Sequence, residues 1–268
     1  MASPNVYPAA FAALGPDITA QIGNYMSGNV LWVDSTSSNA SDANSGLEPE
    51  QPKATWTSAW TAAAANDLIL CQSGHSEVIS VAAMLNKADI MTIGLGLGTL
   101  RPRFTSNVAA AAMWTVTAAR NNFFNCYFPA STAASTARIA VTTGTEAYVF
   151  NSLFECGSND TVNTVTIAAN DAQIEDTQFV AVASRPARAV QLTGATAGFF
   201  MDSCTFDGGA FGWTSRAFDV TATATGMLVH DVQLMNRSDF YVSITGCSYK
   251  LFGVRAMDSG GSRIVIAA

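Results

Sequence analysis

Apolar side chains recur at a regular interval along the chain. One row consists of the last residue of a short repeated segment, at Phe128, Phe154, Phe179, Phe206, Leu234 and Met257. Successive position numbers in this row differ by 26, 25, 27, 28 and 23. Phe104 precedes Phe128 by a similar step, so the repeat begins earlier in the chain. A fixed period of roughly 25 residues is typical of stacked structural units.

A second apolar row follows the same period half a unit earlier, at Val116, Val141, Ile167, Leu192, Val220 and Ile244. Each member lies in a run that alternates between apolar and polar residues, which is typical of strands, and no run of helical period separates them. The sequence therefore predicts an all-β fold, a right-handed parallel β-helix solenoid. In that fold equivalent residues stack about 4.8 Å apart, and the inward columns exclude water.

Polar residues recur just before the first apolar row. They are Asn125, Asn151, Asp176, Ser203 and Asp231. Asn and Asp tolerate bent backbone and bond their own main chain. We therefore expect a ladder of polar turns along one corner of the solenoid.

The ends of the chain differ from the repeat. Residues 1–29 are predicted to form an N-terminal arm that docks on a partner or is loosely packed, with a short helix over 16–26. Residues 30–268 are predicted to form a single β-helix domain. A short helix over about 56–66 is expected to cap the open end, because a first coil otherwise exposes strand edges and core.

Composition narrows the possible functions. Charged residues make up 12% of the chain and the net charge is −7, with 13 scattered Lys and Arg, which argues against nucleic-acid binding. No run of 18 apolar residues occurs, so we expect no membrane span, and we read no secretory signal in the first residues. The five Cys have no CxxC spacing and are expected to be reduced thiols. A weakly charged outer wall predicts contacts between subunits.

The opening of the chain resembles a known family. The segments that carry the likeness are 30–34 (VLWVD), 52–55 (PKAT), 66–70 (NDLIL) and 74–79 (GHSEVI). They resemble the entry of pectate-lyase-like β-helix proteins, and among these the virion proteins of tailed bacteriophages. The resemblance covers residues 28–104 in sequence and the rest in pattern. It implies a stable trimeric particle component, since some members decorate capsids and others are tail spikes that cleave polysaccharide.

Stacked carboxylates are the main candidates for chemistry. Asp176, Asp202 and Asp231 are expected on one face, and Glu155, Glu175 and Asp207 lie nearby in sequence. A carboxylate pair at the right separation hydrolyses glycosides. The alternative is that these residues are turn-forming members of the polar ladder, and we favour it because Asn occupies the equivalent places in earlier coils.

Aromatic residues offer a second candidate, a sugar-stacking platform or a subunit contact built from Trp114, Phe211, Trp213 and Tyr241. His75 and His230 lie far apart in sequence without further ligands at metal-binding spacing. Gly94, Gly96 and Gly98 lack the spacing of a nucleotide-binding loop and are expected to form turns. We therefore assign no catalytic, cofactor-binding or metal-binding residue and expect no cofactor.

These observations lead to a functional hypothesis. We expect a non-enzymatic phage virion protein, a capsid decoration or cement protein located in the virion and assembled in the host cytoplasm. We expect it to form a homotrimer and to contact the major capsid protein or another virion protein through the arm and the lateral faces. The alternative is a tail-spike polysaccharide depolymerase, a glycoside hydrolase or lyase.

Overall fold

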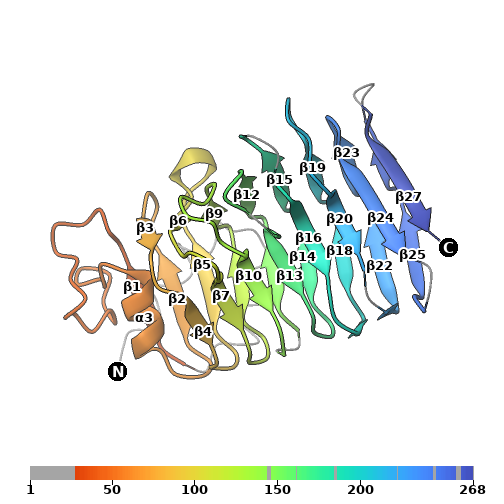
Figure 1. Cartoon of the computed structure of the whole chain (residues 1–268). Helices are drawn as coiled ribbons and strands as arrows, with labels where there is room; N and C mark the ends of the chain where they lie inside the picture. Colours follow the sequence, from red (N-terminus) through yellow and green to blue (C-terminus); the bar gives the residue numbers. More distant parts are fainter. Residues whose placement is uncertain are drawn as a thin grey trace.

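The computed structural model describes residues 28–143, 146–160, 162–183, 186–221, 223–243, 246–257 and 261–267. Residues 1–27 of the predicted arm, including its short helix, lie outside the described residues. The described chain winds into stacked coils in which every strand pairing is parallel, as Figure 1 shows. The prediction of a right-handed parallel β-helix is confirmed.

Three parallel sheets form the walls of the solenoid. Sheet A has nine strands: β1 (Val30–Val33), β2 (Leu68–Cys71), β5 (Met91–Gly94), β8 (Asn122–Phe124), β11 (Tyr148–Phe150), β14 (Gln173–Glu175), β18 (Phe200–Asp202), β22 (Met227–His230) and β25 (Tyr249–Phe252). Sheet B has eight: β3 (Ser76–Ile79), β6 (Arg103–Ser106), β9 (Tyr127–Phe128), β12 (Leu153–Cys156), β15 (Gln178–Ala181), β19 (Thr205–Asp207), β23 (Gln233–Met235) and β26 (Arg255–Ala256).

Sheet C also has eight strands: β4 (Ala83–Leu85), β7 (Ala112–Val116), β10 (Ala137–Val141), β13 (Val165–Ile167), β16 (Arg188–Leu192), β20 (Arg216–Val220), β24 (Asp239–Ser243) and β27 (Arg263–Ala267). A small fourth sheet pairs β17 (Thr196–Ala197) with β21 (Ala224–Thr225). The chain passes from sheet A to sheet B through a very short turn in most coils, so that corner has the most regular geometry.

The first apolar row forms one stacked column inside the solenoid. The ring centroids of Phe128 and Phe154 are 4.4 Å apart, and those of Phe154 and Phe179 are 5.0 Å apart. Phe206 continues the column at 5.0 Å from Phe179. These rings lie nearly parallel and are fully buried, so strand stacking alone places them in contact.

Both rows shift at the C-terminal end. Leu234 pairs with Ala256, so the predicted member Met257 is wrong by one residue. Val220 pairs with Val242, whereas the predicted Ile244 lies two residues further on, outside the described residues. The coils shorten here, and a shift of one residue moves a side chain to the other face of a strand.

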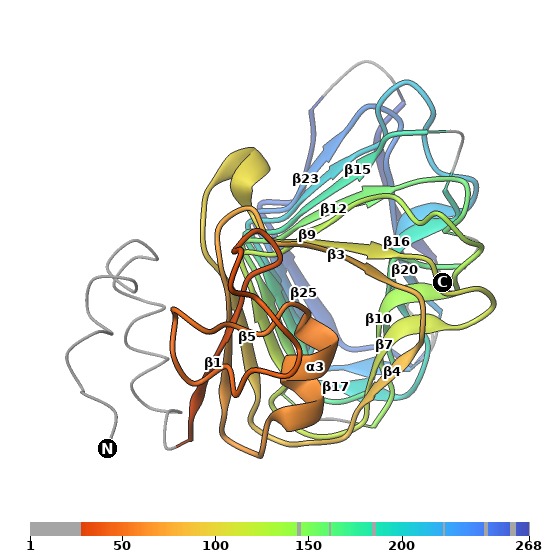
Figure 2. The same cartoon turned by 90° about the vertical axis from the view of Figure 1, so that its left-hand side faces the viewer.

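A helix closes the N-terminal end. Helix α3 (Trp56–Ala62) is shorter than the predicted 56–66, because the Asp67 carboxylate accepts the Ala64 N–H at 2.7 Å and turns the chain toward β2. Trp56 packs against Trp114 with ring centroids 4.2 Å apart. Figure 2 shows α3 lying across the end of the solenoid, where it covers the first core residues.

The remaining sequence features fit this core. Gly94 was expected to form a turn, but it is the last residue of β5, where a Cβ would collide with the carbonyl of Asn125 in the next coil. Residues Gly98–Leu100 form a 3-10 turn, η1. All five cysteines are free, and four of them are buried. Over the described ranges, every helix is too short or too polar to cross a membrane.

Candidate functional site

The corner between sheets A and B carries a column of outward side chains whose chemistry changes along the solenoid. In register, the column reads Trp32, Leu70, Ile93, Phe124, Phe150, Glu175, Asp202, His230 and Phe252. Its first four members are buried in an apolar cluster on the outer side of sheet A. The change to charged residues at Glu175 therefore begins a polar site between two aromatic neighbours, Phe150 and Phe252.

A second column lies one residue further along the chain, in the turn itself. Asn125, Asn151, Asp176, Ser203 and Asp231 all have φ between +46° and +55°. The Asn151 amide donates to the Asn125 side-chain oxygen at 3.3 Å, and Asn125 donates to the Gly94 carbonyl at 2.8 Å. The predicted polar turn ladder is present. It changes at Asp176, because a carboxylate has no N–H with which to continue an amide ladder.

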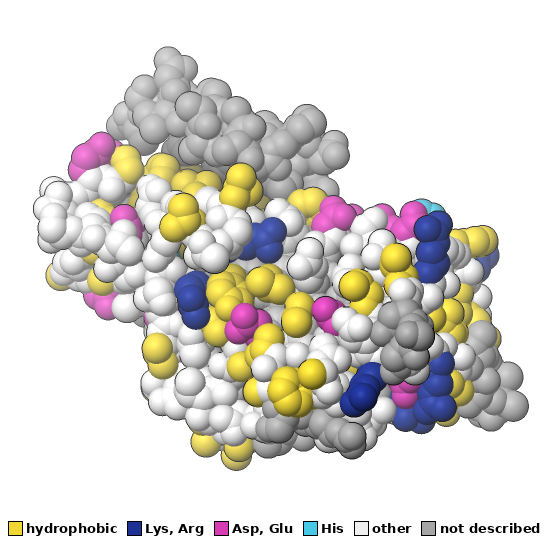
Figure 3. Space-filling view, turned by 90° about the horizontal axis from the view of Figure 1, so that it is seen from above, with side chains coloured by type: hydrophobic (Ala, Val, Ile, Leu, Met, Phe, Trp, Pro, Cys, Tyr) yellow, Lys and Arg dark blue, Asp and Glu magenta, His cyan; other side chains and the backbone are white. Residues whose placement is uncertain are grey.

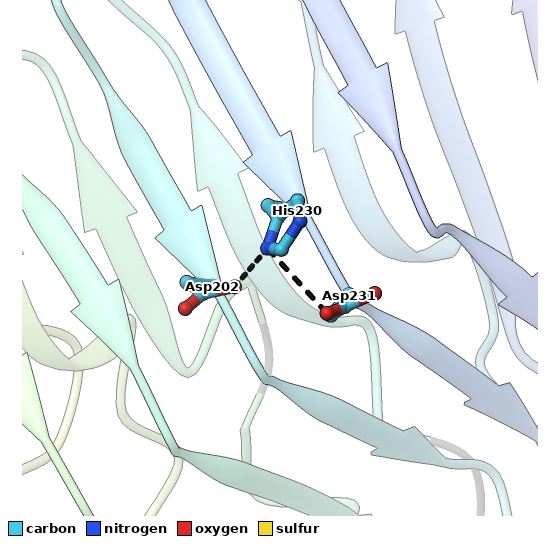
Figure 4. A group of neighbouring side chains, drawn as sticks. All are labelled: Asp202, His230 and Asp231. Carbon is cyan, nitrogen blue, oxygen red and sulfur yellow. Dashed lines mark hydrogen bonds and ion pairs between the residues drawn. The ribbon is translucent and has the colours of Figure 1, made fainter.

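His230 is the centre of the charged part of the corner. Its Nδ1 lies 2.7 Å from Asp202 Oδ1 and 3.6 Å from Asp231 Oδ2, as Figure 4 shows. The two aspartates approach the ring from different coils, since Asp202 belongs to β18 and Asp231 follows β22. Because Nδ1 is taken by Asp202, the other ring nitrogen is left to act on a bound molecule. A base or acid oriented by a third group in this way is a common catalytic arrangement.

The pKa values of these groups are shifted toward the protonated form. The hydrogen bond with Asp202 raises the pKa of His230 above its ordinary value of 6.5. Burial raises the pKa of Glu175 above 4.5, helped by the charges of Asp202 and Asp176 and opposed by a hydrogen bond from Tyr148. Burial and the charge of Asp202 also raise the pKa of Asp176. Partial desolvation and crowded negative charge are the physical causes of the two carboxylate shifts.

A polar hollow of about 290 Å³ lies beside the histidine on the sheet B side of the corner. It is lined by Ser203, Asp231, Gln233, Gly253 and Arg255. Figure 3 shows acidic side chains beside a histidine at the edge of this face, with basic side chains next to them. Asp231 joins the two features, since it lines this hollow and lies 3.6 Å from His230, and Arg255 places a positive charge in the same lining.

This arrangement suits proton transfer better than metal binding. The ligand atoms of Asp202, His230 and Asp231 lie within 4.8 Å of one another, close enough to face one cation. However, a ring nitrogen that donates its proton to Asp202 cannot bind a metal through the same atom. Since the ring nitrogen that faces both aspartates is already hydrogen-bonded to Asp202, the geometry favours acid–base chemistry over metal binding.

The predicted carboxylate set is only partly brought together. Asp202 stacks with Glu175 and His230, whereas Asp176 and Asp231 belong to the neighbouring turn column. The three acids expected on one face thus lie at one corner, but Asp202 is not a member of the turn ladder. Glu155 and Asp207 lie on the outer face of sheet B in another column. There the Asp207 carboxylate accepts the Gly209 N–H at 2.8 Å, which is a turn-forming role.

The predicted aromatic platform does not form. Trp114 is fully buried in the core, and Trp213 is buried with its indole N–H donating to Ser238 Oγ at 3.2 Å. Tyr241 lies under the Arg216 guanidinium, and Phe211 is 40% exposed on the loop after β19. His75 is fully buried and its Nδ1 accepts the Ser35 N–H at 3.0 Å, so its role is structural.

The pairing of Asp202 with His230 was missed from the sequence. The signal was present, since Glu175, Asp202 and His230 follow one another at the same steps as Phe179, Phe206 and Leu234 of the apolar row. Grouping residues by type, as acids, hid the histidine that shares their position. Grouping by position in the repeat would have found it.

No protein-family model matches the chain, and no curated protein matches it in sequence. Among solved structures, a rhamnogalacturonan lyase aligns with a TM-score of 0.38 and 12% identity, over 85% of this chain and 63% of that one. Pectate lyase Pel9A aligns with a TM-score of 0.40 and 12% identity, over 89% of this chain and 82% of that one. The chain thus spans less than two thirds of the rhamnogalacturonan lyase. At this level the likeness concerns the fold.

The expectation of a non-enzymatic protein is corrected, because the sequence argument behind it does not hold at this corner. Both solved structures bear the names of polysaccharide lyases. The sequence argument against an enzyme was that the acids serve only as turn residues. That argument fails for Asp202, which lies before the turn and bonds His230.

Proposed function

We propose that this chain is a polysaccharide-cleaving enzyme whose acid–base groups lie at the corner between sheets A and B. The observation that carries the proposal is the hydrogen bond of Asp202 with His230, in a column that also contains Glu175. The aromatic residues Phe150 and Phe252 flank the charged part of this column on its two sides. Sugar rings present apolar faces to aromatic side chains and hydroxyl groups to carboxylates, so such a row fits an extended glycan.

The shifted pKa values assign the roles. His230, whose protonated form Asp202 stabilises, is the general acid that donates a proton to the glycosidic oxygen of the leaving group. Glu175 is the general base, because the raised pKa makes its carboxylate more basic than an exposed one. Two strand spacings separate these residues, roughly 9.6 Å. This backbone spacing is just above the separation of about 6.5–9.5 Å between carboxyl groups that leaves room for a water molecule in inverting glycosidases.

Glu175 can act as a base in two different reactions, and His230 is the acid in both. If Glu175 removes a proton from water, the hydroxide attacks the anomeric carbon and the products are two saturated sugars. If it removes a proton from a ring carbon, the glycosidic bond breaks by elimination and one product carries a carbon–carbon double bond. Both routes end with the proton of His230 on the leaving oxygen.

The test is an assay of the purified protein on a panel of acidic and neutral polysaccharides. The resemblance to virion proteins of tailed bacteriophages favours bacterial surface polysaccharides as substrates. New reducing ends report cleavage, and ultraviolet absorbance of the unsaturated product distinguishes elimination from hydrolysis. His230→Gln and Glu175→Gln are each expected to lower kcat by about 100-fold or more.

Glu146→Gln is the matched control. Glu146 is an exposed carboxylate that pairs with Arg120 away from the corner, and exposed pairs contribute little to stability. Its activity should equal that of the wild type. Absence of cleavage on every polysaccharide, or full activity of His230→Gln, would disprove the proposal. The homotrimer, the virion location and the contact with a capsid protein stay predictions of the sequence resemblance.

A further inference from the structure

One turn between sheets A and B is longer than the turns that follow it. From β8 onward, each turn from sheet A to sheet B has two residues, as at 125–126 between β8 and β9. The turn from β5 to β6 has eight, residues 95–102, which we call the corner loop. It contains η1, and Figure 2 shows it standing out from the corner between the two sheets. Leu97 and Leu100 on this loop are 74% and 56% exposed.

Both neighbouring coils hold the corner loop in place. From the preceding coil, the Gly74 N–H donates to the Leu100 carbonyl at 2.8 Å. From the following coil, the Asn125 amide donates to two carbonyls at the start of the loop, each at 2.8 Å. Arg101 reaches one coil further, where its Nη2 donates to Asn151 Oδ1 at 3.0 Å. The loop therefore has a fixed position beside the first coils of the turn ladder.

The column of outward side chains is inaccessible on the side of the corner loop. Ile93 and Phe124 are both 0% exposed, so a ligand cannot reach them. Phe150 is half-buried, and the charged members of the column that follow it are half-buried or exposed. The accessible part of the column thus begins at Phe150, beside the contact of Arg101 with Asn151.

The corner has a different shape on the side of His230. The two described turns there, 231–232 and 253–254, have two residues each and form no loop like the one at 95–102. Phe252 is 54% exposed, and the polar hollow lies on this side. A long ligand lying along the column therefore has space beyond His230, whereas Arg101 and the corner loop obstruct it beyond Phe150.

We propose that the corner loop makes this chain an exo-acting enzyme, which removes one or two sugars at a time from one end of a glycan. The inference rests on the polysaccharide cleavage proposed above. In that reaction the cleaved bond lies between Glu175 and His230, near Asp202. Two strand spacings separate Asp202 from Phe150, and this length of roughly 9.6 Å holds about one or two sugar rings. Only the end of a glycan fits there, and the longer part lies over His230 and Phe252.

The test measures product length early in the reaction, on a polysaccharide that the purified protein cleaves. Mass spectrometry is expected to find products of one or two sugars from the start, while the viscosity of the polymer falls slowly. Long fragments with a rapid loss of viscosity would overturn the inference and leave the proposed function standing. Absence of cleavage on every polysaccharide would remove both.

Variants of the corner loop test its role directly. Replacement of residues 95–102 by Asn-Ser, the turn found at 151–152, should change the early products to long fragments. Arg101→Ala removes the group nearest Phe150 and should lengthen the shortest product. The control, Leu97→Ser with Leu100→Ser, keeps the path of the loop and should keep the short products.

Thermal unfolding of each variant shows whether it is folded. A folded replacement variant with unchanged product lengths overturns the proposal. If the replacement does not fold, Arg101→Ala decides, and unchanged product lengths in that variant overturn the proposal as well.

Discussion

Arg138 and Asp160 form an ion pair that is fully buried. Arg138 lies in β10 and Asp160 in the turn after β12, and both side chains are 0% exposed. Arg138 also donates to the Pro129 carbonyl at 2.8 Å, and Asp160 accepts the Gly157 N–H at 2.7 Å. The pair therefore fastens the turn between sheets B and C onto the wall of the solenoid. The stability of this region depends on both partners, since removing one of them leaves the other charge buried and unpaired.

We predict that Arg138→Met lowers the free energy of unfolding by about 3–5 kcal/mol, because the Asp160 carboxylate is left unpaired inside the protein. Urea denaturation followed by tryptophan fluorescence measures the change. The double variant Arg138→Met with Asp160→Leu should recover most of the loss, since it buries no charge. An equal loss in both variants would contradict this account and would point to packing instead.

At the scale of elements, the phenylalanine column joins consecutive coils of sheet B. Phe179 lies between Phe154 and Phe206, at 5.0 Å from each ring. Phe179→Ala is expected to cost about 3–5 kcal/mol of unfolding free energy through lost burial and a cavity. The neighbouring Val180 points outward on the same strand and is partly exposed, so Val180→Ala should cost far less. Similar losses for both variants would show that the column is not a main source of stability.

The turn ladder allows backbone and side-chain effects to be separated. Asn151 has φ +47° and accepts a hydrogen bond from Arg101 at 3.0 Å. Asn151→Gly should cost about 1 kcal/mol for the lost hydrogen bonds, because glycine adopts this φ freely. Asn151→Ala should cost a further amount of about 1–2 kcal/mol for left-handed backbone. Thermal or urea unfolding measures both, and equal stability of the two variants would contradict the strain argument.

The strands could be predicted from the sequence where the position of a residue in the repeat alone determines which residue of the next coil it contacts. Phe128, Phe154 and Phe179 stack because strands in neighbouring coils are in register, and their spacing shows this register in the sequence. The prediction failed at Met257 and Ile244, where shorter coils change the register by one or two residues. The burial of Arg138 could not be predicted, since it depends on how a turn folds back over sheet C. The pair of Asp202 and His230 was predictable from spacing but was hidden by sorting residues by type.

At the scale of the whole molecule, the constant spacing of stacked strands fixes the separations between side chains from different coils. One coil brings Asp202 into hydrogen-bond contact with His230, and two coils separate Glu175 from that histidine. Residues far apart in sequence thereby share one surface.

The pH dependence of cleavage follows from this arrangement. Glu175 must be ionised to act as a base, so activity is expected to rise with pH through its pKa, which burial places above 4.5. His230 must be protonated to act as an acid, so activity is expected to fall with pH through its pKa, which Asp202 raises above 6.5. The profile of kcat/KM against pH should therefore be bell-shaped. Asp202→Asn removes the main cause of the His230 shift and should move the descending limb to lower pH. The ascending limb should also move to lower pH, but less, because burial is the larger cause of the raised pKa of Glu175 and the charge of Asp202 a smaller one. A descending limb that does not move in Asp202→Asn would show that another group donates the proton, whereas loss of the ascending limb in that variant would exchange the roles of Asp202 and Glu175.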